Sequence, residues 1–197
     1  MLFALCCLSA LLVQWLCFVP AYICQTEKYY DLVGSLTYIT IAISALFLSD
    51  SADARSLLIA ALVVVWAMRL GSFLFLRILA DGHDGRFDRI KPNPVRFFTT
   101  WTMQGVWVAV TLSAGLAAIT GQRSVEPDGW MMVGALVWLS GMTIEVVADR
   151  QKRQFRRAPQ NQGRFIDTGL WSRSQHPNYF GEIMLWVGIA LIAVPVS

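Results

Sequence analysis

Six long apolar stretches constrain the fold of this chain more than any other feature of its sequence. They occupy approximately residues 2–24, 32–48, 57–80, 98–120, 129–148 and 179–195. A helix needs about 20 mostly apolar residues to cross roughly 30 Å of hydrocarbon, and each stretch approaches or exceeds that length. Of the 197 residues, 56% are hydrophobic and only 15% are charged, well below the quarter typical of soluble proteins. We therefore expect an all-α, polytopic membrane helix bundle with about six transmembrane helices, forming a single integral domain over residues 1–197.

The first apolar stretch is expected to remain in the protein as a membrane span. No basic segment precedes it, and it is longer than the apolar part of a signal peptide. It holds all of the cysteines, Cys6, Cys7, Cys17 and Cys24. Because no cysteine elsewhere offers a distant disulfide partner, we expect these residues to act as small apolar side chains. A lipidated or metal-binding role for the first two is a weaker alternative.

The basic residues of the connecting loops predict an orientation in the membrane. The first, third and fifth loops hold twelve of them, and the second and fourth loops hold only Arg55 and Arg123. The twelve are Lys28, Arg86, Arg89, Lys91, Arg96, Arg150, Lys152, Arg153, Arg156, Arg157, Arg164 and Arg173. Because basic loops stay in the cytoplasm, we expect the N-terminus outside, and the inner membrane if the source is bacterial. The modest net charge of +3 is explained by this orientation without nucleic-acid binding.

Polar residues inside the second and third stretches are expected to face the protein interior. The second stretch carries four hydroxyl residues, Ser35, Thr37, Thr40 and Ser44. In the third, Arg69 lies near mid-span, where a charge costs about 2.5–3.5 kcal/mol on insertion scales. A buried ion pair and the binding of an anionic ligand remain equal alternatives for this arginine. The loop that follows, "DGHDGRFDRIKPNP", fits no metal-ligand spacing, so we expect local charge pairing and no metal.

The fifth stretch is expected to continue as a charged helix beyond its apolar block, until Pro159 interrupts it. Charged residues at helical spacing form one stripe, with the acids toward the membrane. The residues on this stripe are Glu145, Asp149, Lys152 or Arg153, and Arg156. One interpretation is a set of helix ion pairs that also contacts anionic lipid headgroups. The other is a clamp in which arginine forks hold phosphates and an acid orients a neighbouring sugar or base.

The sixth stretch begins with an unusual set of polar residues, "SRSQHPNYFGE". Pro177 is expected at the first helical position, where its missing N–H costs nothing. Asn178 and Glu182 then share a helix face, one turn apart, and could bind a primary amide. A membrane-interface cap, with Trp171 and Tyr179 as interfacial aromatic residues, is the alternative. It does not explain a glutamate one turn inside the span.

Together, these two segments resemble a known family. "ADRQKRQF" followed by "GRFIDTGLWSRSQHPNYFGEIMLWVGI" is similar to the C-terminal half of the steroid 5-alpha-reductase-like membrane proteins, especially the bacterial branch termed DUF1295. The similarity covers Glu145 to Leu191 and is weaker upstream, in "RLGSFLFLRI" and "DGRFDRI". It implies that approximately residues 129–197 form the half of the protein that binds NADPH, and that this site faces the cytoplasm.

The resemblance also implies a role for individual residues. Asn178 and Glu182 would contact the nicotinamide end of NADPH, whereas Asp149, Arg153 and Arg156 would serve its ribose and phosphates. Tyr179 and His176 would line the same pocket, and they are the only candidates for a catalytic role. The implied reaction is hydride transfer to the polarised C=C bond of a steroid-like or other lipid enone, which enters from the bilayer.

Two features of the sequence depart from the family pattern. Gln175 replaces the usual arginine before His-Pro, and the chain ends at Ser197, where family members continue into a further hydrophobic segment. The resemblance therefore implies a C-terminally truncated or degenerate copy. Carbonyl-binding residues of the family lie in the N-terminal half, where this sequence offers only polar candidates. They are Gln14, Glu27, Tyr29 and Tyr38.

Two alternatives to a reductase remain. The isoprenylcysteine methyltransferases also carry His-Pro-x-Tyr-x-Gly at the start of a late span, but they bind S-adenosylmethionine. That cofactor has no phosphate, so Asn178 together with the basic stripe favours NADPH. The second alternative is a non-catalytic membrane protein that retains the scaffold.

Overall fold

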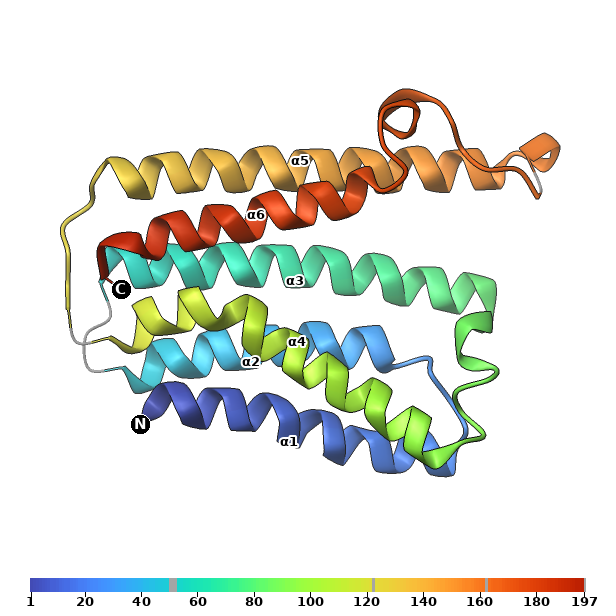
Figure 1. Cartoon of the computed structure of the whole chain (residues 1–197), viewed down its shortest axis with the longest axis horizontal. Coiled ribbons are helices and arrows are strands. Elements are labelled where there is room, and N and C mark those ends of the chain that lie inside the picture. Colours follow the sequence, from blue (N-terminus) through green and yellow to red (C-terminus); the bar gives the residue numbers. More distant parts are fainter. Residues whose placement is uncertain (50–52, 122, 162, 197) are drawn as a thin grey trace. The chain divides into compact units, whose positions relative to one another are not determined.

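The chain is built from helices throughout the part that its computed structural model describes, residues 1–49, 53–121, 123–161 and 163–196 (Figure 1). The long helices are α1 (Leu2–Ile23), α2 (Tyr30–Leu48), α3 (Ala54–Asp81), α4 (Pro94–Thr120), α5 (Gly129–Arg157) and α6 (Pro177–Ala193). Within these residues, six helices are long and apolar enough to cross a membrane. The expected all-α polytopic membrane bundle is therefore confirmed, and the outward N-terminus stays a prediction.

Three of the helices begin at a side-chain cap. Asp53 accepts a hydrogen bond from the Ser56 N–H at the start of α3, and Asn93 and Asp128 do the same for the N–H groups three residues further on in α4 and α5. Such a cap satisfies one of the N–H groups that the first turn leaves free. Local sequence thus sets where these spans begin.

Arg55 lies in α3, because this helix begins earlier than the apolar pattern predicts. The sequence predicts this arginine in the second loop, but α3 begins at Ala54 and includes it. Its side chain is 1% exposed, and its Nη2 donates to the Glu126 carbonyl at 3.3 Å. Arg55 is therefore a buried residue that contacts the segment before α5, which corrects the expectation of an exposed loop charge.

The helices fall into two compact units. One contains Met1–Glu126, with α1 to α4, and the other contains Pro127–Pro195, with α5 and α6. Each unit has its own packed interior, and the expectation of one integral domain stays a prediction.

In the first unit, α1 packs against α4 and α2, and α2 packs against α3. One end of this unit is filled by aromatic rings, of which Phe87, Phe97 and Trp101 are buried. Further along α2, the Tyr38 ring meets Trp66 edge-on, with ring centroids 5.0 Å apart. Its hydroxyl lies 2.6 Å from the Thr111 hydroxyl, so this tyrosine links three helices.

The loop after α3 is held to the turn between α1 and α2 by charged groups. Glu27 is 5% exposed, pairs with Lys91 and accepts the Asp84 N–H at 2.9 Å. Burial alone would raise the pKa of Glu27, but these hydrogen bonds outweigh it and lower the pKa. Arg77 lies 3.7 Å from Asp31 and 3.9 Å from Asp84. The expected charge pairing in this loop is therefore confirmed.

The hydroxyl residues of α2 do not all face the interior. Ser35 and Thr37 are buried, and both donate to a backbone carbonyl one turn earlier. Thr40 is exposed and Ser44 is half-buried. Thr40 is therefore not buried as expected, because it lines an open space between α1 and α2.

Candidate functional site

Glycines bring α5 and α6 into close contact. A Cβ atom added to Gly141 would lie 2.5 Å from the Gly181 carbonyl oxygen, and one added to Gly188 would lie 2.7 Å from that of Gly134. Only hydrogen at these positions allows the backbones to approach so closely, as is common between membrane helices. This contact was not predicted from the sequence, although both helices repeat glycine at a spacing of seven residues.

This contact places carboxyl groups of the two helices near one another. Glu145 is 2% and Asp149 is 7% exposed. A Cβ at Gly181 would lie 2.7 Å from the Glu145 backbone nitrogen, so α6 passes this side of α5 directly. Glu182 directly follows Gly181 and is half-buried, and Asp149 lies one turn beyond Glu145. Asp149 and Glu182, far apart in the sequence, therefore lie in one region.

Asn178 lies on the first turn of α6, one turn before Glu182. The helix begins at Pro177, which occupies an N-terminal helical position as predicted. Asn178 is half-buried, and a spacing of four residues puts it on the same face as Glu182. The free N–H groups of this helix end add hydrogen-bond donors and the positive end of the helix dipole.

The C-terminal part of α5 extends beyond the first turn of α6 and carries the basic residues (Figure 1). Helix α5 continues to Arg157, which confirms the predicted charged extension ahead of Pro159. Arg153 and Arg156 are exposed, and neither forms an ion pair with any residue that the structure describes. The extension therefore offers two guanidinium groups to an external anion.

Trp171 packs against α5. It is 9% exposed, and its Nε1 donates to the Ala148 carbonyl at 3.0 Å. The Lys152 ammonium lies 4.6 Å from the centroid of its ring, a cation–π contact. Both contacts hold the segment before α6 to α5. The predicted charged stripe on α5 had either Lys152 or Arg153 at one position, and the tryptophan ring contacts Lys152.

Gln151 fixes the segment that returns from α5 to α6. Its Oε1 accepts the Leu170 N–H at 3.0 Å. Gly169 precedes this N–H with a φ of +62°, a conformation that favours glycine, and a Cβ there would lie 2.6 Å from the Gln151 side chain. Sequence reasoning did not identify Gln151, since only the fold shows which side chain meets this turn.

His176 and Tyr179 form an aromatic pair at the start of α6. Their rings are stacked at a centroid distance of 5.3 Å and an interplanar angle of 22°. Tyr179 is 55% exposed, so the pair presents a ring surface beside Asn178. Their predicted places in a cofactor pocket stay predictions.

These features define an integral, multi-pass α-helical membrane protein whose last two helices carry acidic, amide and basic groups at one end. The sequence matches the family described as "Protein of unknown function (DUF1295)" over residues 17–197. The chain belongs to this family, as its resemblance indicated.

The chain is also similar to part of several curated steroid dehydrogenases. It is 32% identical over 75 residues to 3-oxo-5-alpha-steroid 4-dehydrogenase 1 of Bos taurus, which covers 36% of this chain and 29% of that protein. It is 33% identical over 98 residues to 3-oxo-5-alpha-steroid 4-dehydrogenase 2 of Homo sapiens, covering 42% of this chain and 39% of that protein. The matches therefore span less than half the length of these relatives. No solved structure matches the chain.

Proposed function

We propose that the protein is an NADPH-dependent membrane reductase of a steroid-like or other lipid enone, with its cofactor held by α5 and α6. The observation that carries this proposal is the close packing of α6 against α5 at Gly181, which brings Asp149 into one region with Asn178 and Glu182. Two unpaired arginines lie further along α5. The curated relatives support the reaction type, since their names describe 4-dehydrogenases of 3-oxo-5-alpha-steroids.

The α6 end of the site suits a carboxamide such as that of nicotinamide. Asn178 offers both a donor and an acceptor, and the carboxylate of Glu182 can accept from an amide NH₂ group. Both side chains are half-buried, so each keeps an accessible surface. These two residues would orient the nicotinamide.

The α5 extension suits the ribose and phosphates. Arg153 and Arg156 lie four and seven residues beyond Asp149, which is about 6 and 10 Å along a helix axis. Arginine binds phosphate through paired, parallel hydrogen bonds, and a carboxylate such as that of Asp149 accepts from ribose hydroxyls. The order along α5 is thus a sugar-binding acid followed by two phosphate-binding bases.

The bound cofactor would supply a hydride to the electron-poor carbon of the enone. The protein would position that cofactor through Asn178 and Glu182. A lipid enone is the fitting substrate class, because it can reach a membrane-embedded reductase from the bilayer. His176 and Tyr179 are the chain's candidates for a group that contacts the substrate.

NADPH titration of the purified protein in detergent tests the cofactor assignment. We expect the dissociation constant to rise at least tenfold in Asn178→Ala and in Arg156→Ala, about 1.4 kcal/mol or more. Arg123→Ala removes the same charge as the second variant, from the segment before α5, and should bind like the wild type. Unchanged binding in both site variants would falsify the assignment.

A parallel titration with S-adenosylmethionine separates the alternatives. We expect much weaker binding than that of NADPH, because S-adenosylmethionine has no phosphate and its single carboxylate can pair with only one of the two arginines. Tight binding of S-adenosylmethionine without NADPH binding would instead indicate a methyltransferase. NADPH oxidation on addition of a conjugated 3-oxo steroid then tests turnover.

A further inference from the structure

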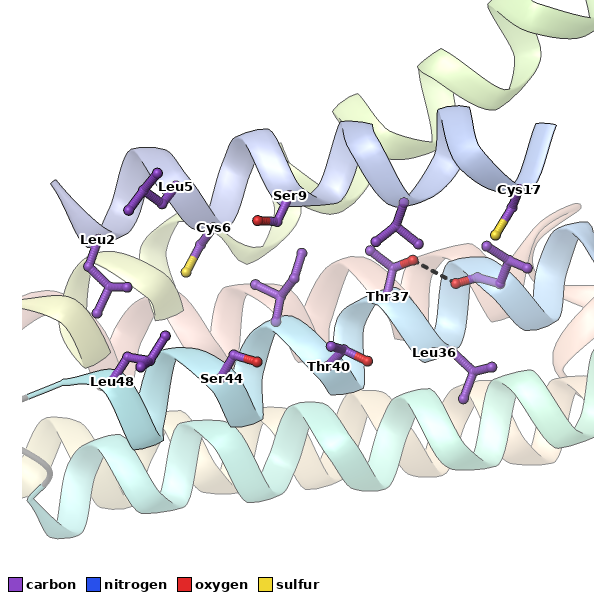
Figure 2. A pocket seen from close by; sticks show the side chains of 13 residues that line it. Leu2, Leu5, Cys6, Ser9, Cys17, Leu36, Thr37, Thr40, Ser44 and Leu48 are labelled. Carbon is purple, nitrogen blue, oxygen red and sulfur yellow. Dashed lines mark hydrogen bonds between the residues drawn. The ribbon is translucent and has the colours of Figure 1, made fainter. Parts of the chain in front are cut away.

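A second candidate binding site lies in the first unit, between α1 and α2. The structure has a cavity of about 380 Å³ there, lined by residues 2–17 of α1 and 33–48 of α2 (Figure 2). Most of the lining is aliphatic, and Leu36 is 50% exposed at its edge. Pockets of this volume with few polar groups are typical of small-molecule sites.

The proportions of the cavity favour a linear molecule. On each helix the lining residues extend over 15 residues, or about 22 Å at 1.5 Å per residue. A cavity drawn out over this length along two helices suits an extended hydrocarbon chain.

Three hydroxyl groups lie near the middle of this length. Figure 2 shows Ser9 of α1 across the cavity from Thr40 and Ser44 of α2. Most hydroxyls of the spans donate to a carbonyl in the preceding turn, as those of Thr102 and Thr143 do. By contrast, none of the three cavity hydroxyls has a hydrogen-bond partner among the residues that the structure describes.

The fourth hydroxyl of the lining, that of Thr37, is already used. It donates to the Val33 carbonyl at 2.7 Å (Figure 2) and accepts from Nε2 of the fully buried Gln14 at 2.9 Å. The direction of the second bond follows from the first, since the single hydroxyl proton is already engaged. The Oε1 atom of Gln14 has no donor among the described residues. Unused hydrogen-bonding capacity therefore lies both in the cavity lining and beside it.

We propose that this cavity binds a linear lipid that carries a hydroxyl or carbonyl oxygen part-way along its chain. The narrow apolar ends hold the chain, and the oxygen pairs with the hydroxyls of Ser9, Thr40 and Ser44. An unpaired polar group in an apolar environment is costly, so such a ligand gains affinity over an unsubstituted chain. This site does not depend on NADPH binding by the second unit.

Photolabelling of the purified protein in lipid nanodiscs tests the proposal. The probe is a linear fatty acid with a photoreactive diazirine at the end of its chain, and labelled positions are mapped by peptide mass spectrometry. We expect labelling on α1 and α2 at cavity residues. A mid-chain hydroxy fatty acid should compete at about tenfold lower concentration than the unsubstituted acid, and cholesterol should not compete.

Two kinds of variant complete the test. Ser44→Phe fills the cavity and should reduce labelling at least tenfold, whereas Ser140→Phe, on an exposed position of α5, should not. The triple variant Ser9→Ala, Thr40→Val and Ser44→Ala barely changes the volume, so it tests the oxygen contact even if Ser44→Phe does not fold. It should keep labelling and lose the tenfold preference. Equal competition by the two acids in the wild type, effective competition by cholesterol, or labelling spread over all helices would overturn the proposal.

Discussion

The contact between α5 and α6 makes Gly141→Ala the most informative single substitution in the second unit. The added Cβ would lie 2.5 Å from the Gly181 carbonyl oxygen and 2.6 Å from the Leu185 backbone nitrogen. Both are backbone atoms of α6, so no rotamer change relieves the clash. Ordinary contact needs about 3.5 Å, and α6 must therefore move away by about 1 Å.

The cost follows from packing energetics. Forcing extra carbon into a packed interface costs about 1–3 kcal/mol. The displacement also separates Glu182 from Asp149, the two acids that the proposed cofactor site brings together. We therefore expect lower stability and weaker NADPH binding from one methyl group that lies about two turns before Asp149 on α5 and opposite Gly181, the residue before Glu182.

Thermal unfolding in detergent, followed by loss of the monodisperse peak on size exclusion, measures the first effect. For a chain of this length, 1 kcal/mol corresponds to about 2–4 °C in the unfolding temperature. The matched control is Gly129→Ala at the start of α5, where an added Cβ meets nothing within 4 Å. We expect that control to be neutral or slightly stabilised, because alanine restricts the unfolded chain.

One result would refute the packing of α5 against α6. If Gly141→Ala unfolds at the same temperature as Gly129→Ala, the close approach of α5 to α6 is wrong. If Gly141→Ala loses stability but keeps its NADPH affinity, the packing is correct and the proposed position of the cofactor site is wrong. The double variant Gly141→Ala, Gly181→Ala should be non-additive, because residues in contact are coupled.

Two further predictions concern the loops. The pKa of Glu27 in the folded protein lies below its ordinary value of 4.5. The stability gained from the ionised carboxylate is therefore complete above pH 4.5 and is lost as the pH falls through the lowered pKa. Lys91→Met removes the pairing cation and leaves the burial that raises the pKa of Glu27, so the variant should lose about 1–3 kcal/mol at neutral pH, where Glu27 is ionised. Its unfolding temperature should also fall less on acidification than that of the wild type, because the folded pKa moves up toward or above the unfolded value. The same profile in Lys91→Met and in the control Lys28→Met would contradict this. Trp171→Ala removes a buried ring and its hydrogen bond to Ala148, which should cost about 3 kcal/mol. Limited proteolysis should then cut the segment between α5 and α6 faster than in the control Phe165→Ala, whose ring is 95% exposed. Equal cleavage of the two variants would show that the tryptophan does not hold this segment.

The sequence allowed the helix boundaries of the last unit to be predicted closely. Pro159 and Pro177 end and begin helices for a local reason, since proline cannot continue a helix but fits its first turn. The predicted continuation of α5 beyond its apolar block is likewise observed to Arg157. Arg55 was misplaced because the apolar pattern begins after the capped first turn that Asp53 sets.

The candidate site could be predicted only in part. Helical spacing placed Asn178 and Glu182 on one face, and the charged stripe on α5, because both are properties of a single helix. The facing of Asp149 and Glu182, the burial of Trp171 and the role of Gln151 depend on which sides of two segments meet. The sequence shows the glycines that decide which sides meet, but it does not show which backbone atoms of the other helix they contact.

The sequence by itself determined the number of membrane spans, most of their ends and the family of this protein. These follow from local properties: apolar length, caps, prolines and a contiguous motif. Only the tertiary structure decided how α5 meets α6 and where the cavity between α1 and α2 lies. The physical reason is that lipid is as apolar as the bundle interior, so hydrophobic periodicity distinguishes the faces of a membrane helix poorly. Small residues and hydrogen bonds between helices select the pairing, and they act only once the helices are together.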